Sequence, residues 1–164
     1  MASTQPDLTG RRILVVEDDY SVAVDICDDL RKVGATVLGP APTSHYAYNL
    51  LLGRRGVDGA ILDIRLHGAD VFDLARELRE RGVPMVFATG YSGDIPAAFL
   101  GTPLLSKPIA SDQLIRVVDD LIRERTQLPP PLPEVPPPSA SAMLERPISE
   151  RFCLAVARAM SSGH

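Results

Sequence analysis

The stretch ILVVEDD, residues 13–19, decides the fold class. Four apolar residues are followed directly by the three carboxylates Glu17, Asp18 and Asp19. A strand that is apolar at every position, instead of at every second position, is typical of a parallel sheet covered on both faces. The carboxylates then lie at the carboxyl end of this strand.

Further short apolar runs alternate with segments whose apolar residues recur three or four positions apart, which is the helical period. Strands and helices that alternate at this spacing predict an α/β fold, with right-handed crossovers and helices on both faces of a parallel sheet. The predicted strands are 13–16, 36–38, 60–62, 85–88 and 104–105, and the predicted helices cover 22–33, 47–51, 71–78 and 114–122.

The fourth crossover, residues 90–102, breaks this pattern. It contains three glycines and a proline, so that only residues 97–100 have room for a helical turn. A parallel crossover normally needs a dozen or more residues with a helix that covers the sheet. We therefore expect thin cover on this part of the sheet and more mobility than elsewhere.

Composition excludes several classes of protein. The 164 residues are 45% hydrophobic, which suffices for a core, and the net charge of -4 does not fit a nucleic-acid-binding surface. No run approaches the ~18 apolar residues of a membrane span, and the polar start lacks the apolar segment of a signal peptide. We expect a cytoplasmic protein without nucleic-acid or membrane contacts, in which Cys27 and Cys153 are reduced core thiols.

The C-terminal part has a different composition. Seven of the ten residues 129–138 are proline, so that residues 127–145 are predicted to form a stiff linker. Residues 146–160 have helical spacing and predict one short amphipathic helix, which could fold back, dimerise or stay disordered. We expect no DNA-binding or catalytic output domain in so short and proline-rich a tail, and therefore an output through protein contacts.

Polar residues follow four of the five predicted strands. The carboxyl ends of parallel strands share one edge of the sheet, so Glu17, Asp18, Asp63, Thr89 and Lys107 should converge there. Carboxylates that converge without a counter-charge repel one another, and a divalent cation resolves this. Oxygen ligands without His or Cys favour Mg²⁺.

This site has a chemical interpretation. We expect Asp18 and Asp63 to bind Mg²⁺ directly, Glu17 to bind it through water, and the backbone carbonyl of Arg65 to complete the set. A carboxylate such as Asp63 can attack a phosphoryl group to form an acyl phosphate. Lys107 and Thr89 are then catalytic candidates. The Lys107 ammonium would neutralise the phosphoryl charge, and the Thr89 hydroxyl would donate to one of the phosphoryl oxygens.

The motifs ILVVEDD, ILDI, FAT and SKP, in this order and spacing, resemble the receiver domain of two-component response regulators. The resemblance covers residues 11–126 and implies a flavodoxin-like, doubly wound sheet of five parallel strands in the order 2-1-3-4-5. It also implies that Asp63 is the phosphoacceptor, that a histidine kinase or histidine phosphotransfer protein is the donor, and that the Lys107–Pro108 bond is cis.

Two positions depart from the common receiver pattern. His67 stands where most receivers have proline, and Leu104 stands where many carry the switch aromatic. FATGYS resembles instead the FAT-GUY subclass of stand-alone receivers, whose fourth helix is short or disordered, and makes Tyr91 a candidate switch aromatic. We expect His67 to be near the site in sequence only.

The same residues are compatible with functions other than a phosphoacceptor switch. The protein could be a phosphate sink or relay, a scaffold that takes no phosphate, or a phosphoaspartyl phosphatase acting on small substrates. The usual hydrolases place a second carboxylate two residues after the nucleophile, where this chain has Arg65, so we expect a signalling protein and no turnover enzyme. Alone, the carboxylates after the first strand could merely cap a helix.

Overall fold

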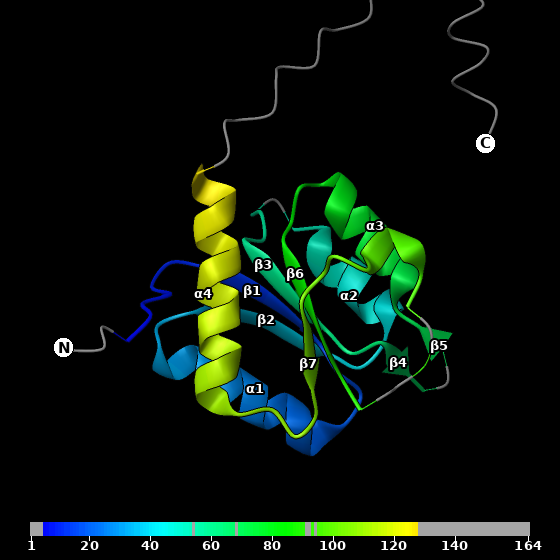
Figure 1. Cartoon of the computed structure of the whole chain (residues 1–164), viewed down its shortest axis with the longest axis horizontal. Helices are drawn as coiled ribbons and strands as arrows, with labels where there is room; N and C mark the ends of the chain where they lie inside the picture. The colour runs from blue at the N-terminus through cyan, green and yellow to red at the C-terminus, as the bar shows by residue number, and fades with distance from the viewer. Residues whose placement is uncertain (1–4, 54, 68, 91–92, 94, 128–164) are drawn as a thin grey trace, which may run out of the picture. The chain divides into compact units, whose positions relative to one another are not determined.

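A five-stranded parallel sheet forms the centre of the fold (Figure 1). The computed structural model describes residues 5–53, 55–67, 69–90, 93 and 95–127. The strand order is β2-β1-β3-β6-β7, which confirms the predicted arrangement. The strands are β1 Arg12–Val16, β2 Thr36–Ala41, β3 Gly59–Leu62, β6 Met85–Thr89 and β7 Leu104–Ser106.

A small hairpin that was not predicted from the sequence follows β3, and its two strands account for the labels β4 and β5. It is formed by β4, Arg65–Leu66, and β5, Ala69–Asp70, which pair antiparallel immediately after β3. These strands have two residues each, too few for a pattern of alternating burial to be visible in the sequence.

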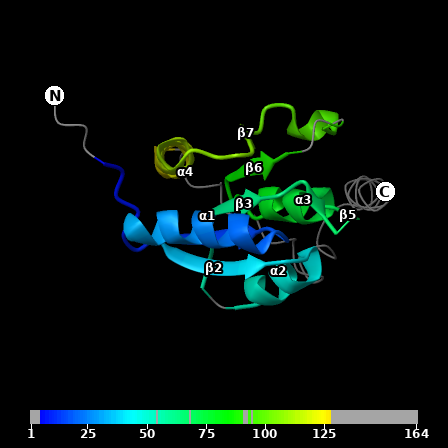
Figure 2. The same cartoon turned by 90° about the horizontal axis from the view of Figure 1, so that it is seen from below.

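Helices cover both faces of the sheet (Figure 2). The helices α1, Tyr20–Lys32, and α4, Ser111–Gln127, pack on one face, and α2, Ser44–Leu51, and α3, Phe72–Glu80, pack on the other. Each face has its own hydrophobic core, and the sheet residues alternate between the two. This explains why the runs 13–16, 60–62 and 85–88 are apolar at every position.

Two helices begin at side-chain caps. Asp19 Oδ1 accepts a hydrogen bond from the Val22 N–H at 3.1 Å, and Thr43 Oγ1 accepts one from the Tyr46 N–H at 3.1 Å. Such caps satisfy backbone donors that have no partner within the helix. Of the three carboxylates after β1, Asp19 therefore serves the local capping role.

Strand β2 continues beyond its predicted end at Leu38. Its backbone passes through a cis Gly39–Pro40 bond to Ala41. Gly39 has φ +107°, and a Cβ added there would lie 2.6 Å from the carbonyl oxygen of Val15. The glycine is required for this close approach to β1.

The fourth crossover contains a single 3-10 turn, η1, Ala97–Phe99, close to the predicted turn at 97–100. Phe99 is only 1% exposed, and its ring stacks on Phe72 with centroids 5.6 Å apart. It also meets Phe87 of β6 edge-on at 5.7 Å, and the Arg79 guanidinium lies 4.3 Å from its centroid. One aromatic residue therefore anchors the thin crossover.

Some predictions fall at or beyond the end of the described residues. Helix α4 includes Gln127, so the predicted linker can begin no earlier than residue 128. The rest of that linker, the predicted tail helix and Cys153 lie outside the described residues, whereas Cys27 is a buried free thiol as predicted. None of the helices in the described part of the chain is long and apolar enough to span a membrane.

Candidate functional site

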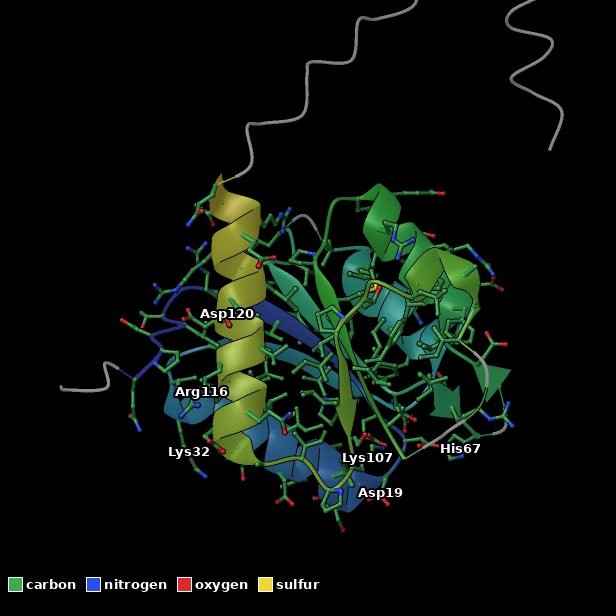
Figure 3. The ribbon with its side chains drawn as sticks, viewed as in Figure 1. Asp19, Lys32, His67, Lys107, Arg116 and Asp120 are labelled. Carbon is green, nitrogen blue, oxygen red and sulfur yellow. The ribbon has the colours of Figure 1, made fainter. Side chains whose placement is uncertain are left out.

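The carboxyl ends of the strands bring the predicted site residues to one edge of the sheet. Val16 pairs with Leu62, so Glu17 and Asp63 follow adjacent strands at the same level. Thr89 pairs with Ser106, which places Lys107 one residue further along. Figure 3 labels Lys107, Asp19 and His67 in this region of the molecule. The sequence predicted that Thr89 follows the fourth strand. In the structure it is the last residue of that strand, β6.

Lys107 connects two of the carboxylates. Its Nζ lies 2.8 Å from Asp63 Oδ2 and 2.5 Å from Glu17 Oε2. Burial by itself lowers the pKa of Lys107, but its hydrogen bond to Asp63 and the charges of Asp63 and Glu17 outweigh this effect and raise the pKa above the ordinary value. The ammonium therefore stays charged at neutral pH. The Lys107–Pro108 bond is cis, as the resemblance implied.

Glu17 is the most deeply buried member of the group, at 3% exposure. Its Oε1 accepts the Asp19 N–H at 3.0 Å. Its Oε2 is buried and ion-paired with Lys107 Nζ, without hydrogen-bond geometry to any described residue. Desolvation raises the pKa of Glu17 to about 7, although Lys107 opposes the shift.

The acidic residues are close enough to share one cation. Glu17, Asp18 and Asp63 each offer a ligand oxygen, and these atoms all lie within 4.8 Å of one another. A cluster of three carboxylates faces one ammonium, and it includes a buried oxygen without a hydrogen bond. The donor set is made of hard oxygen atoms, so it fits Mg²⁺.

Asp63 is held in a defined orientation. Its Oδ1 accepts the Arg65 N–H at 3.1 Å, while Oδ2 faces Lys107. Arg65 is the first residue of β4, so the hairpin supports the Asp63 carboxylate directly. The Arg65 carbonyl as a metal ligand, and Glu17 as a ligand through water, stay predictions.

Thr89 is 3% exposed, and its carbonyl oxygen accepts the Lys107 N–H at 3.1 Å. The backbone therefore ties the threonine to the lysine at the ends of β6 and β7. The role predicted for its hydroxyl group remains a prediction. Tyr91 lies outside the described residues.

The expectation that His67 is near the site in sequence only was wrong. The His67 N–H donates to Asp18 Oδ2 at 2.8 Å, and His67 Nδ1 lies 3.6 Å from the same oxygen. The cause is the unpredicted hairpin, whose turn carries His67 back over the end of β1. The one available sequence signal is the dipeptide His67–Gly68 between Leu66 and Ala69, since glycine in a two-residue connection is typical of a tight hairpin.

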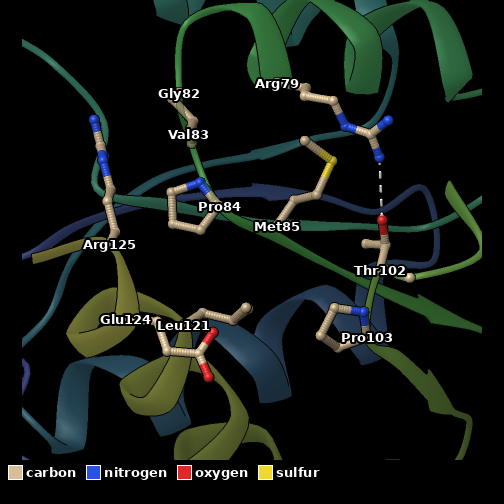
Figure 4. A pocket seen from close by; sticks show the side chains of 11 residues that line it. Arg79, Gly82, Val83, Pro84, Met85, Thr102, Pro103, Leu121, Glu124 and Arg125 are labelled. Atoms are coloured by element: carbon tan, nitrogen blue, oxygen red, sulfur yellow. Dashed lines mark hydrogen bonds between the residues drawn. The ribbon is translucent and has the colours of Figure 1, made fainter. Parts of the chain in front are cut away.

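A separate hollow lies near the amino-terminal ends of β6 and β7, away from the acidic site (Figure 4). It has a volume of about 310 Å³ and is lined by Arg79 of α3 and by residues of the loop and start of β6, the segment before β7 and the last turns of α4. Of its two arginines, Arg79 donates to the Ala98 carbonyl and Arg125 to the Val57 carbonyl at 3.1 Å. None of the site residues lines this hollow, so it belongs to no part of the acidic site.

The chain is similar to several known proteins. No model of a protein family matches the chain. The chain is 31% identical over 119 residues to the sensory transduction protein RegX3 of Mycolicibacterium smegmatis, with 68% of this chain and 50% of the relative covered. It is 32% identical over 114 residues to a response regulator receiver protein of Anaeromyxobacter sp., with 68% of this chain and 46% of that relative covered.

A solved structure extends these matches. The crystal structure of a response regulator receiver protein from Sinorhizobium medicae is 26% identical, with a TM-score of 0.61, and the match covers 73% of this chain and 99% of that one. The chain spans about half the length of the curated relatives that it matches.

Proposed function

The names of these relatives and of the solved structure support a response regulator receiver domain in this chain, and on this premise we propose that the protein is a phosphoacceptor switch. The phosphoacceptor is Asp63. The observation that carries the proposal is the position of Lys107, whose ammonium lies 2.8 Å from Asp63 Oδ2 and 2.5 Å from Glu17 Oε2.

The reaction is a phosphoryl transfer from phosphohistidine. A carboxylate oxygen of Asp63 attacks the phosphorus atom, and a P–O bond forms while the P–N bond breaks. The imidazole of the donor leaves with the electron pair and takes up a proton. The product is an acyl phosphate on Asp63.

The residues around Asp63 have separate tasks. Lys107 neutralises charge on the transferring group, and the Thr89 hydroxyl donates to one of its oxygens. Asp18, Asp63 and Glu17 hold Mg²⁺, which when bound offsets the negative charge that the phosphoryl group brings to the site. The Arg65 N–H keeps the Asp63 carboxylate oriented for attack.

The donor that fits this chemistry is a histidine kinase or a histidine phosphotransfer protein. We place the protein in the cytoplasm, in the FAT-GUY subclass of stand-alone receivers, with the domain at residues 11–126 followed by a linker and a short helix. Phosphorylation changes the surface formed by the fourth crossover and α4, and so changes the binding of a partner protein.

The test is the intact mass of the protein after incubation with Mg²⁺ and a small phosphodonor such as a phosphoramidate. We expect one phosphoryl adduct on the wild type and none on Asp63→Asn, which keeps the size of the side chain but lacks the nucleophile. An equal adduct on both proteins contradicts the proposal. Release of many phosphates per protein supports a phosphatase instead.

A further inference from the structure

The turn between β4 and β5 holds His67 against Asp18. His67 has φ +47°, a left-handed conformation that residues other than glycine rarely adopt. Its backbone N–H donates to Asp18 Oδ2 at 2.8 Å. This hydrogen bond joins residues 49 positions apart, so it fixes the backbone of the hairpin turn beside the acidic cluster and keeps the imidazole near Asp18.

The imidazole lies at a distance from Asp18 that one metal ion can bridge. His67 Nδ1 is 3.6 Å from Asp18 Oδ2. Two ligand atoms that are each about 2.1 Å from a cation stand about 3.0 Å apart at a right angle and about 3.4 Å apart at a tetrahedral angle. The His67 side chain is 67% exposed, so a small rotation of the ring closes the difference.

Asp18 has the capacity for this second role. Its side chain is 21% exposed, so its carboxylate remains accessible from solvent. A carboxylate oxygen has two lone pairs, so Oδ2 can accept the His67 N–H and still bind a cation. Behind Asp18, the one Lys107 ammonium is shared between the Glu17 and Asp63 carboxylates.

The position differs from that of the predicted Mg²⁺ ligands. The ligand atoms of Glu17, Asp18 and Asp63 lie within 4.8 Å of one another, and His67 is not part of that group. A cation held by the imidazole would therefore lie on the outer, solvent side of Asp18. Imidazole is a ligand for Ni²⁺, Co²⁺ or Zn²⁺ and a poor one for Mg²⁺.

We propose that Asp18 and His67 form a second cation position, selective for divalent metals that accept imidazole, and that its occupation excludes Mg²⁺ by taking Asp18. This inference rests on the proposed function, because it adds a competing metal to the same phosphorylation site. A metal in this position keeps Mg²⁺ from Asp18 and so lowers the phosphorylation of Asp63.

The test is calorimetric titration of the tag-free, full-length protein with Ni²⁺ and, separately, with Mg²⁺. We expect His67→Asn to weaken Ni²⁺ binding about tenfold or more, the scale on which altered metal-site residues act, and to change Mg²⁺ binding by less than about twofold. Asparagine keeps the backbone N–H and tolerates a positive φ. Asp18→Asn should weaken the binding of both metals.

Matched controls separate this position from other histidines. His45 is exposed on α2, and His45→Asn should leave the binding of both metals unchanged, as should His164→Asn. Added Mg²⁺ should raise the apparent Kd of Ni²⁺ in the wild type, because the two ions share Asp18.

Three results would overturn the inference: unchanged Ni²⁺ binding in the His67→Asn variant, equal losses of Ni²⁺ and Mg²⁺ binding in that variant, or Ni²⁺ binding that is indifferent to Mg²⁺. The second result would mean that the ring only holds Asp18 in place. All three results concern metal affinity alone. Failure of Asp63 to accept phosphate is a separate outcome, which the mass comparison of wild type with Asp63→Asn reports.

Discussion

Replacing Phe99 by alanine tests how the thin fourth crossover is attached to the sheet. The Phe99 side chain is 1% exposed, and its ring contacts Phe72 and Phe87 at centroid distances of 5.6 and 5.7 Å. Truncating a buried phenylalanine to alanine costs about 3–5 kcal/mol of unfolding free energy. A domain of this size typically has about 5–15 kcal/mol in total, so Phe99→Ala should fold but be strongly destabilised.

Urea unfolding followed by far-ultraviolet circular dichroism measures this effect, because the chain has no tryptophan to serve as a fluorescent probe. The matched control is Leu100→Ala. Leu100 is the next residue but is 73% exposed, so its truncation should change stability by less than about 0.5 kcal/mol. A loss below about 1 kcal/mol for Phe99→Ala, or one no larger than that of Leu100→Ala, would refute the claim that Phe99 anchors the crossover.

Three further predictions concern the acidic site. Burial raises the pKa of Glu17 from 4.5 to about 7, so the folded protein without metal retains a proton that the unfolded chain loses, and its stability should fall as the pH rises through this range. The loss should be on the order of 1–3 kcal/mol in urea titrations with a chelator, and Glu17→Gln should remove this pH dependence. Lys107→Met leaves Glu17 and Asp63 without their ammonium, so the phosphoryl adduct should diminish in intact-mass spectra while Mg²⁺ still binds. Full phosphorylation of this variant would exclude a role for Lys107. Thr89→Ala should slow phosphorylation about 10-fold or more and Thr89→Ser much less, as measured by adduct formation over time, and equal rates would show that the hydroxyl has no part.

The fold and the central site could be predicted from the sequence because both follow from local rules. Apolar runs such as residues 13–16 predict buried parallel strands, and parallel strands place their carboxyl ends at one edge. Asp63, Thr89 and Lys107 therefore had to converge once the strands were correctly identified. Their convergence needed no knowledge of the loops.

The position of His67 could not be predicted in this way. It depends on a hairpin with two residues in each strand, whose pairing leaves no periodic signal. The contact with Asp18 also joins residues 49 positions apart, and nothing in the local sequence specifies such a pairing. The same limitation applies to β2, which continues to Ala41 only because Gly39 permits a close approach to β1.

The importance of Phe99 was missed for a different reason. The crossover around it is rich in glycine and has no amphipathic period, so its composition predicted thin cover and mobility. The structure shows η1 packed by one ring against Phe72 and Phe87. A single large side chain can anchor a segment that carries no helical signal, and only the packing of its neighbours reveals it.

The central claim is that Asp63 carries the phosphoryl group as an acyl phosphate. Borohydride reduction of the phosphorylated protein tests it most directly, because hydride converts an aspartyl phosphate to homoserine and leaves a free aspartate unchanged. Peptide mass spectrometry should then find homoserine at position 63 in the phosphorylated protein and not in the untreated one. Homoserine at another aspartate, or none in a protein that carries phosphate, would contradict the account.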